Sequence, residues 1–318
     1  MKIACIGEAM IEVALTGQTG AAQVGFAGDV LNTAIYLRRA LPAVHEVAFV
    51  SMIGRDSLSD QMATFIAAEG ISIAHLSRHP TLVPGLYTIA TDALGERSFA
   101  YWRDTSAARQ MFRDPAALQP LLGFDFIYLS AITLAILPDP ARQALFDVLT
   151  QFRAKGGLVA FDSNHRPRLW PDLATAQRVV EQAWRGCDLG LPSLDDEMAL
   201  FGDADAPQVQ ARLRGWGVAQ GALKCGALGP LALGQGWGAD VTFAAAPSVV
   251  DTTAAGDSFN GGYLAALILG ALPLDAARKG HAFARAVVQQ RGAIVPRADW
   301  SGALKASSVG CAHSSGVA

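Results

Sequence analysis

Residues 251–259 read Asp-Thr-Thr-Ala-Ala-Gly-Asp-Ser-Phe, and this stretch decides how the rest of the chain is interpreted. Its small residues come directly before a predicted helix whose apolar side carries Phe259, Tyr263, Leu264, Leu267 and Ile268. A turn of small residues lets backbone N–H groups approach a ligand, and a helix N-terminus carries about half a positive charge. The stretch therefore predicts an anion hole suited to a phosphate. Asp257 lies at the helix start, where its carboxylate can accept a proton from a hydroxyl group or simply cap the helix.

Upstream of this helix, short apolar runs alternate with amphipathic stretches. The runs predicted as strands are 2–6, 47–52, 126–129, 158–161 and 189–191. The stretches predicted as helices are 31–41, 57–69, 140–154 and 173–184. This alternation predicts an α/β fold with a mainly parallel sheet, helices on both faces and right-handed crossovers.

Two regions break the alternation. Residues 8–28 contain β-branched residues and glycines without a helix pattern, and residues 85–103 have the pattern of two strands joined by a turn at Asp92–Gly95. We expect these regions to form a small separate sheet, or lid. The alternative is that they add edge strands to the main sheet.

The C-terminal part continues the same pattern. It predicts strands at 221–224, 231–233 and 241–244, followed by helices at 256–269 and 274–290. Residues after Ser301 are rich in Ser, Gly and Ala and show no periodicity, which predicts a frayed end. The expected organisation is one domain over residues 1–300 and a flexible tail over 301–318.

Composition excludes several classes of protein. Of the 318 residues, 51% are hydrophobic and 17% are charged, and the net charge of −3 gives no attraction to nucleic acid or to an anionic membrane. The sequence has neither a signal-peptide pattern nor an apolar run of about 18 residues that could span a bilayer. Its four cysteines, Cys5, Cys187, Cys225 and Cys311, form no metal-binding pattern, so we assign no metal ligand directly and expect reduced thiols in a cytoplasmic protein.

Two motifs in the chain resemble the signatures of a known enzyme family. Asp251 to Asp257 resembles the C-terminal signature of the ribokinase-like, or PfkB, carbohydrate kinases, and Phe26-Ala27-Gly28-Asp29 with Asn32 resembles their N-terminal motif. The resemblance extends from Lys2 to about Arg297. It implies a three-layer α/β/α core with a β-sheet lid, and transfer of the ATP γ-phosphoryl group to a sugar. It also implies that Asp257 is the catalytic base and that Ala254, Ala255 and Gly256 form the anion hole.

Further segments narrow the resemblance to family members that phosphorylate 2-keto-3-deoxygluconate. These segments are Gly85-Leu86-Tyr87, Tyr101-Trp102-Arg103, Asn164 to Trp170 and Arg291 to Arg297. The implied reaction places the phosphate on the 6-hydroxyl. Rival interpretations are a fructokinase or nucleoside kinase of the same fold, or a sugar-binding sensor without activity. Asp257 with its anion hole favours an enzyme.

The implied sugar site contains Gly28, Asp29, Asn32, Tyr87, Tyr101, Arg103 and Arg166. Asp29 and Asn32 are three residues apart, so one helix face can present both, although Asp29 can also be only a helix cap. Tyr101 and Arg103 are two apart on a predicted strand and share a face. Two arginines in a buried site without an anion repel each other, so this pair indicates an acidic sugar, with the phosphates as an alternative partner for Arg166. A solvated edge-strand arginine is the alternative for Arg103.

The implied nucleotide site contains Asn164, Arg166, Ser193, Lys224, Gly226, Gly229, Gly256 and His281. Ser193 stands where relatives often carry the Asn of an Asn-x-x-Glu motif, near Asp196 and Glu197. His281 is expected either to line the adenine pocket or to pack within its helix. Lys224 precedes Cys225, and a neighbouring cation can lower the pKa of a thiol.

The resemblance also implies cofactors and assembly. We expect ATP with Mg²⁺, a possible monovalent cation, and a homo-oligomer. The chain departs from the family pattern at Ala27, Ala254, His165 and Cys225, but it keeps the base, the anion hole and the arginines.

Overall fold

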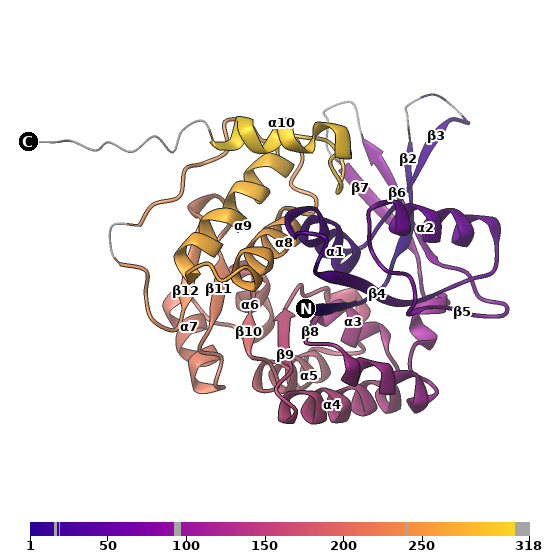
Figure 1. Cartoon of the computed structure of the whole chain (residues 1–318), viewed down its shortest axis with the longest axis horizontal. Coiled ribbons are helices and arrows are strands. Elements are labelled where there is room, and N and C mark those ends of the chain that lie inside the picture. Colours follow the sequence, from indigo (N-terminus) through magenta and orange to yellow (C-terminus); the bar gives the residue numbers. More distant parts are fainter. Residues whose placement is uncertain (16–17, 19, 92–96, 239–240, 309–318) are drawn as a thin grey trace, which may run out of the picture.

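The computed structural model describes residues 1–15, 18, 20–91, 97–238 and 241–308. Its centre is an eight-stranded sheet in the order β12-β11-β10-β9-β8-β1-β4-β5 (Figure 1). All neighbouring strands are parallel except β11 and β12, which are antiparallel. In the same order the strands are Pro230–Leu233, Gly221–Lys224, Leu189–Gly190, Leu158–Asp162, Phe126–Ser130, Lys2–Ile6, Glu46–Ile53 and Leu76–Arg78.

Helices cover both faces of this sheet and enclose two apolar cores. One face carries α1 (Asp29–Ala40), α2 (Ser57–Ala68), α8 (Ala255–Ile268) and α9 (Pro273–Val287). The other carries α3 (Ala131–Ile136), α4 (Asp139–Ala154), α5 (Leu173–Arg185), α6 (Leu194–Phe201) and α7 (Ala206–Gly215). Short 3-10 turns are found at Ala107–Gln110, Pro115–Gly123, Pro167–Leu169 and Gly226–Leu228. The predicted α/β core is confirmed.

A second sheet of four strands stands apart from the first (Figure 1). Its order is β3 (Ala22–Ala27), β2 (Met10–Leu15), β6 (Gly85–Thr91) and β7 (Arg97–Trp102). The two hairpins are antiparallel, whereas β2 and β6 pair in parallel and join them. The predicted separate sheet is confirmed, and the edge-strand alternative is wrong. The predicted turn at Asp92–Gly95 lies outside the described residues.

Glycines in α8 set the position of its N-terminus. A Cβ on Gly261 would lie 2.7 Å from the Cβ of Tyr36 in α1, and one on Gly262 would lie 2.8 Å from the ring of Phe283 in α9. Only glycine allows such close packing. As a result α8 lies between α1 and α9, and its first turn lies beside the first turn of α1.

Two sequence predictions for the C-terminal part are wrong. Residues 241–244 form no strand, and Phe243 instead packs against Gly229 and the ring of His281. The chain also continues as helix α10 (Arg297–Ser308) where a frayed end was expected. Trp300 docks this helix, with its ring 5.0 Å from Tyr36 and 4.8 Å from Phe283. Residues 309–318, with Cys311, lie outside the described part.

Within the described residues, none of the helices has the length and apolarity needed to cross a membrane.

Candidate active site

A cavity of about 420 Å³ opens at the edge of the main sheet where its parallel strands end, below the lid sheet. The first turns of α1 and α8 form part of its wall. The structure brings most of the predicted site residues to this cavity, namely Gly28, Asp29, Asn32, Tyr87, Tyr101, Asn164, Arg166, Ser193, Lys224, Ala254, Ala255, Gly256 and Asp257. Arg103, Gly226, Gly229 and His281 do not line it.

Asp257 lies in the first turn of α8 and faces α1. The Asn32 side-chain amide donates a hydrogen bond to its Oδ2 at 2.8 Å, and the Thr33 hydroxyl donates to its backbone carbonyl at 3.2 Å. Burial and then the charge of Asp29 raise the pKa of Asp257 to about 8, against the opposing effect of the Asn32 hydrogen bond. The ionised form of Asp257 is therefore a stronger proton acceptor than an ordinary carboxylate, and the ionised fraction decreases as the pH falls below about 8.

The anion hole predicted for the segment before Asp257 stays a prediction, and the local backbone shows which of its N–H groups a ligand can use. Ala254 caps α8 in the left-handed region at φ 59°, which turns the chain into the helix. The Ala255 N–H donates to the Thr252 carbonyl at 3.2 Å, so it is already used within a turn. In the described part of the chain, the Ala254 and Gly256 N–H groups have no such partner and remain free for an anion.

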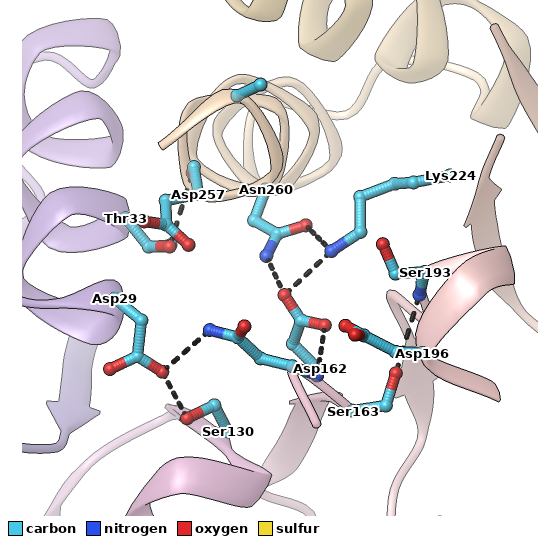
Figure 2. Close-up of polar contacts among 12 residues, drawn as sticks. Asp29, Thr33, Ser130, Asp162, Ser163, Ser193, Asp196, Lys224, Asp257 and Asn260 are labelled. Carbon is cyan, nitrogen blue, oxygen red and sulfur yellow. Dashed lines mark hydrogen bonds and ion pairs between the residues drawn. The ribbon is translucent and has the colours of Figure 1, made fainter. Parts of the chain in front are cut away.

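Lys224 supplies a positive charge beside this helix start. Its Nζ lies 3.7 Å from where a Cβ on Gly256 would be, and it donates to Asp162 Oδ2 at 2.7 Å and to Asn260 Oδ1 at 3.1 Å. The Asn260 amide in turn donates to Asp162 Oδ2 at 2.6 Å (Figure 2). These contacts hold the ammonium group close to the anion hole.

Sequence reasoning missed Asp162 and Asn260. Asp162 ends strand β9 and is 3% exposed, and Asn260 lies inside α8, one turn after the predicted base. A carboxylate at the end of a buried parallel strand is a signal that could have identified Asp162. Nothing in the local sequence distinguishes Asn260 from a surface residue of a helix.

Asp29 does not cap α1, so that alternative is wrong. Gly28 precedes the helix without a side-chain cap, and Asp29 Oδ2 accepts hydrogen bonds from the Ser130 hydroxyl and from the Asn164 amide (Figure 2). Burial raises the pKa of Asp29. Asn164 has φ 23°, and its own N–H donates to Asp162. Asp29 and Asn32 both line the cavity, as their spacing predicted.

The lid contributes two stacked tyrosines to the cavity. Tyr87 and Tyr101 are paired across β6 and β7, with ring centroids 5.7 Å apart. Tyr87 is buried and its hydroxyl donates to Glu12, whereas Tyr101 is 50% exposed. An aromatic surface of this kind suits the apolar face of a sugar.

Arg103 does not lie in the cavity, where the sequence predicted it. It follows the last residue of β7, is 8% exposed and forms an ion pair with the buried Glu8. The expectation that it shares an environment with Tyr101 is wrong, and so is the alternative of a solvated side chain. Because Glu8 balances its charge, the argument that the two arginines need a ligand anion fails for Arg103.

Arg166 does face the cavity, together with Asp196. Its side chain is 52% exposed, and its Nη1 lies 3.5 Å from Asp196 Oδ1. Ser193 precedes α6, and its N–H donates to the Ser163 hydroxyl at 3.4 Å (Figure 2). Glu197 does not line the cavity, and its carboxylate accepts a hydrogen bond from Arg212 at 2.9 Å. Of the neighbouring acids Asp196 and Glu197, Asp196 is therefore the one that a ligand can reach.

The other predicted nucleotide residues form a separate cluster. Gly226 and Gly229 have φ 56° and 82°, in the turn between β11 and β12. His281 contacts the Ala244 carbonyl at 2.8 Å and packs against Phe243, which also contacts Gly229. This placement matches a histidine packed within the fold, and its adenine-binding role stays a prediction.

Cys225 does not have the reactive thiol expected from its neighbour. Burial and then the charge of Asp195 raise its pKa to about 11, and the Lys224 ammonium group donates to Asp162 instead. The expected lowering of this pKa is wrong.

Comparison with known proteins is consistent with this geometry. The profile of the pfkB family carbohydrate kinases matches residues 1–300. The chain belongs to the pfkB family. As a carbohydrate kinase of this family, it transfers a phosphoryl group from ATP to a sugar, and the family uses a divalent metal ion.

This pfkB-family kinase has similar relatives over nearly its full length. The 2-dehydro-3-deoxygluconokinase of Escherichia coli (strain K12) is 43% identical over 303 residues, which are 93% of this chain and 97% of the relative. The crystal structure of the PfkB protein from Polaromonas sp. JS666 has a TM-score of 0.79 and 27% identity, covering 95% of this chain and 99% of that one. The fructokinase of Vibrio cholerae O395, bound to fructose, ADP and calcium, shares the fold with a TM-score of 0.80 at 23% identity, over 95% and 98% of the two chains.

Proposed function

We propose that the chain phosphorylates 2-dehydro-3-deoxy-D-gluconate on its 6-hydroxyl, with ATP as the donor. The 43% identity to a 2-dehydro-3-deoxygluconokinase over 93% of the chain supports this substrate. The observation that carries the chemistry is the position of Asp257, which lies at the start of α8 beside the Asn32 amide and the free Gly256 N–H. One carboxylate thus faces both a phosphate site and a polar sugar site.

In the proposed reaction, Asp257 accepts the proton of the 6-hydroxyl. The bond from this oxygen to the γ-phosphorus forms as the bond from the γ-phosphorus to the β,γ-bridging oxygen breaks, and ADP leaves. Such transfers depend mainly on positioning and charge neutralisation. Asn32 holds the carboxylate in place, and the helix start and Lys224 attract the transferred phosphoryl group.

The donor set near the cavity also fits Mg²⁺. Among the described residues no group of three or more His, Cys, Asp or Glu side chains could hold a metal ion by itself. Mg²⁺ in kinases is usually held by one or two carboxylates together with phosphate oxygens and water. Asp196 lines the cavity and would contribute to holding the ion, which when bound neutralises phosphate charge.

The sugar is expected between the first turn of α1 and the lid. Gly28, Asp29 and Asn32 offer polar groups on one side, and the rings of Tyr87 and Tyr101 lie on the other. Arg166 is the arginine that reaches the cavity directly, and it suits the substrate carboxylate or the phosphates.

A coupled assay of ADP release tests the proposal. The substrates are 2-dehydro-3-deoxygluconate, its galactonate epimer, and neutral sugars such as fructose. We expect the highest kcat/KM for an acid of this series. A higher value for fructose would instead make the chain a fructokinase, and no ADP release with any sugar would favour a sensor. Self-association and a monovalent cation requirement remain predictions from the resemblance, and a cytoplasmic location remains a prediction from the sequence pattern.

A further inference from the structure

The chain passes between the main domain and the lid at four places. It enters the lid between β1 and β2 and returns after β3 at Gly28; it enters again at Gly85 and returns after β7 at Arg103. The first passage carries Glu8 and the last carries Arg103. These two side chains form an ion pair, so the pair joins the first and last passages.

The ion pair is buried and incompletely satisfied. Glu8 is 1% exposed and Arg103 is 8% exposed. Arg103 Nη2 donates to Glu8 Oε2, whereas Glu8 Oε1 and Arg103 Nε are buried without a hydrogen-bond partner in the described structure. Because desolvation of two charges offsets much of their attraction, a buried pair of this kind contributes little net stability. Its presence at this point therefore calls for a role other than stability.

The other two passages lie against the same two residues: Gly28 against the backbone of Glu8, and Gly85 against both side chains. A Cβ on Gly28 would lie 2.2 Å from the Glu8 carbonyl oxygen. One on Gly85 would lie 2.8 Å from Glu8 Oε1 and 3.0 Å from Arg103 Cβ. The missing side chains let all four passages meet around Glu8.

Residues of the sugar site lie directly next to these passages. Asp29 follows Gly28, Met10 lies two residues after Glu8, and Tyr101 lies two residues before Arg103; all three line the cavity. Burial raises the pKa of Asp29, and the positive charge of Arg103 is among the groups that oppose this rise.

We propose that Glu8 is a positioning residue for sugar binding, which fixes Arg103 and, through it, the lid side of the sugar site. The inference rests on the proposed function and deepens it, because Arg103 directly follows β7, the lid strand that carries Tyr101 to the sugar cavity. When Glu8 is neutral, Arg103 loses its only carboxylate partner among the described residues and leaves its place at the junction of the four passages.

A double-mutant cycle tests this role. The variants are Glu8→Gln, which keeps the size of the side chain, Arg103→Gln, and the two combined. For each variant we would measure kcat and the KM values for the sugar acid and for ATP. We expect Glu8→Gln to raise the sugar KM about 10-fold, the value of one charged hydrogen bond, and to change the ATP KM less than about 2-fold. The double variant should be no worse than Arg103→Gln alone, because coupled residues are not additive.

Glu69→Gln is the matched control. It breaks another buried ion pair, Arg39 with Glu69, whose side chains are 2% and 9% exposed and lie away from the sugar cavity. We expect it to lower the melting temperature and to leave the sugar KM unchanged. If Glu8→Gln behaves in the same way, Glu8 is only structural and the inference is wrong.

Two further outcomes overturn the inference. One is that the effects of Glu8→Gln and Arg103→Gln multiply in the double variant, since Glu8 then acts independently of Arg103. The other concerns Glu8→Asp, which replaces Glu8→Gln in the cycle if Glu8→Gln does not fold. An unchanged sugar KM in Glu8→Asp contradicts the positioning role. By contrast, a wild-type protein that phosphorylates no sugar acid refutes the proposed function itself.

Discussion

Asn32 and Asp257 are 225 positions apart in sequence, yet the Asn32 amide donates to the Asp257 carboxylate at 2.8 Å. The contact exists because α1 and α8 start side by side, which glycines inside α8 allow. It joins the polar set expected for the sugar to the group expected to take the proton.

Replacement of Asp257 by Asn should remove the base and keep the shape of the site. We expect kcat to fall by about 10²–10⁴-fold, the usual value of a positioned proton acceptor. The sugar Kd, measured by calorimetry, should stay within a few-fold of wild type. Turnover close to wild type would show that another group takes the proton.

The pH dependence of kcat/KM should report the same carboxyl group. Its pKa is raised to about 8, so Asp257 is protonated below that pH and cannot act as the base. We therefore expect kcat/KM for the sugar to fall tenfold per unit as the pH drops below about 8. Asn32→Ala removes a hydrogen bond that lowers this pKa, so the fall should begin at a higher pH. A fall that begins at the same pH in both proteins would contradict this assignment.

Cys225 should be a slow thiol that the nucleotide protects. Its pKa of about 11 leaves little thiolate at neutral pH, so alkylation by iodoacetamide should be slow and should accelerate as the pH rises. Because Cys225 adjoins the predicted nucleotide turn, saturating ATP should reduce its labelling, measured by mass spectrometry, and the sugar should not. Equal labelling with and without ATP would separate this turn from the nucleotide.

Arg212 should be a large contributor to stability. It donates to the fully buried Glu197 and to Asp203, and its guanidinium lies 4.0 Å from the centre of the Phe201 ring. Arg212→Ala leaves a buried carboxylate without its cation, so we expect a loss of about 3–5 kcal/mol in urea unfolding. Arg278→Ala, which breaks an exposed pair with Asp275, is the control and should cost less than about 1 kcal/mol. Similar losses in both variants would contradict the prediction.

The fold could be predicted from sequence where local pattern decides it. Strands β1 and β11 agree with their predicted limits because each is a short apolar run with a clear end. Helix α10 was missed because its Ser, Gly and Ala residues carry no periodic pattern, and its packing depends on Trp300 meeting Tyr36 from a distant helix.

The site was predictable where a motif names the residue, as at Asn32 and Asp257. Asp162, Asn260 and Glu8 carry no motif, and their importance comes from contacts with partners far along the chain. The sequence placed Arg103 beside the substrate because it could not show that Glu8 already neutralises it. Residue spacing predicts which side chains share a face of a strand, but it does not predict which charged side chain from another segment pairs with them.

The parallel pairing of β2 with β6 has a consequence for the order of folding. Met10 pairs with Gly85, so this pairing closes a loop of chain that contains α1, β4 and α2. Contacts of such long sequence separation form late, because the entropy cost of closing the loop comes first. Pulse-labelled hydrogen exchange during refolding should therefore find β2 and β6 protected after β1 and β4. The sheet that carries Tyr87 and Tyr101 thus becomes native after the neighbouring β1–β4 pair of the main sheet.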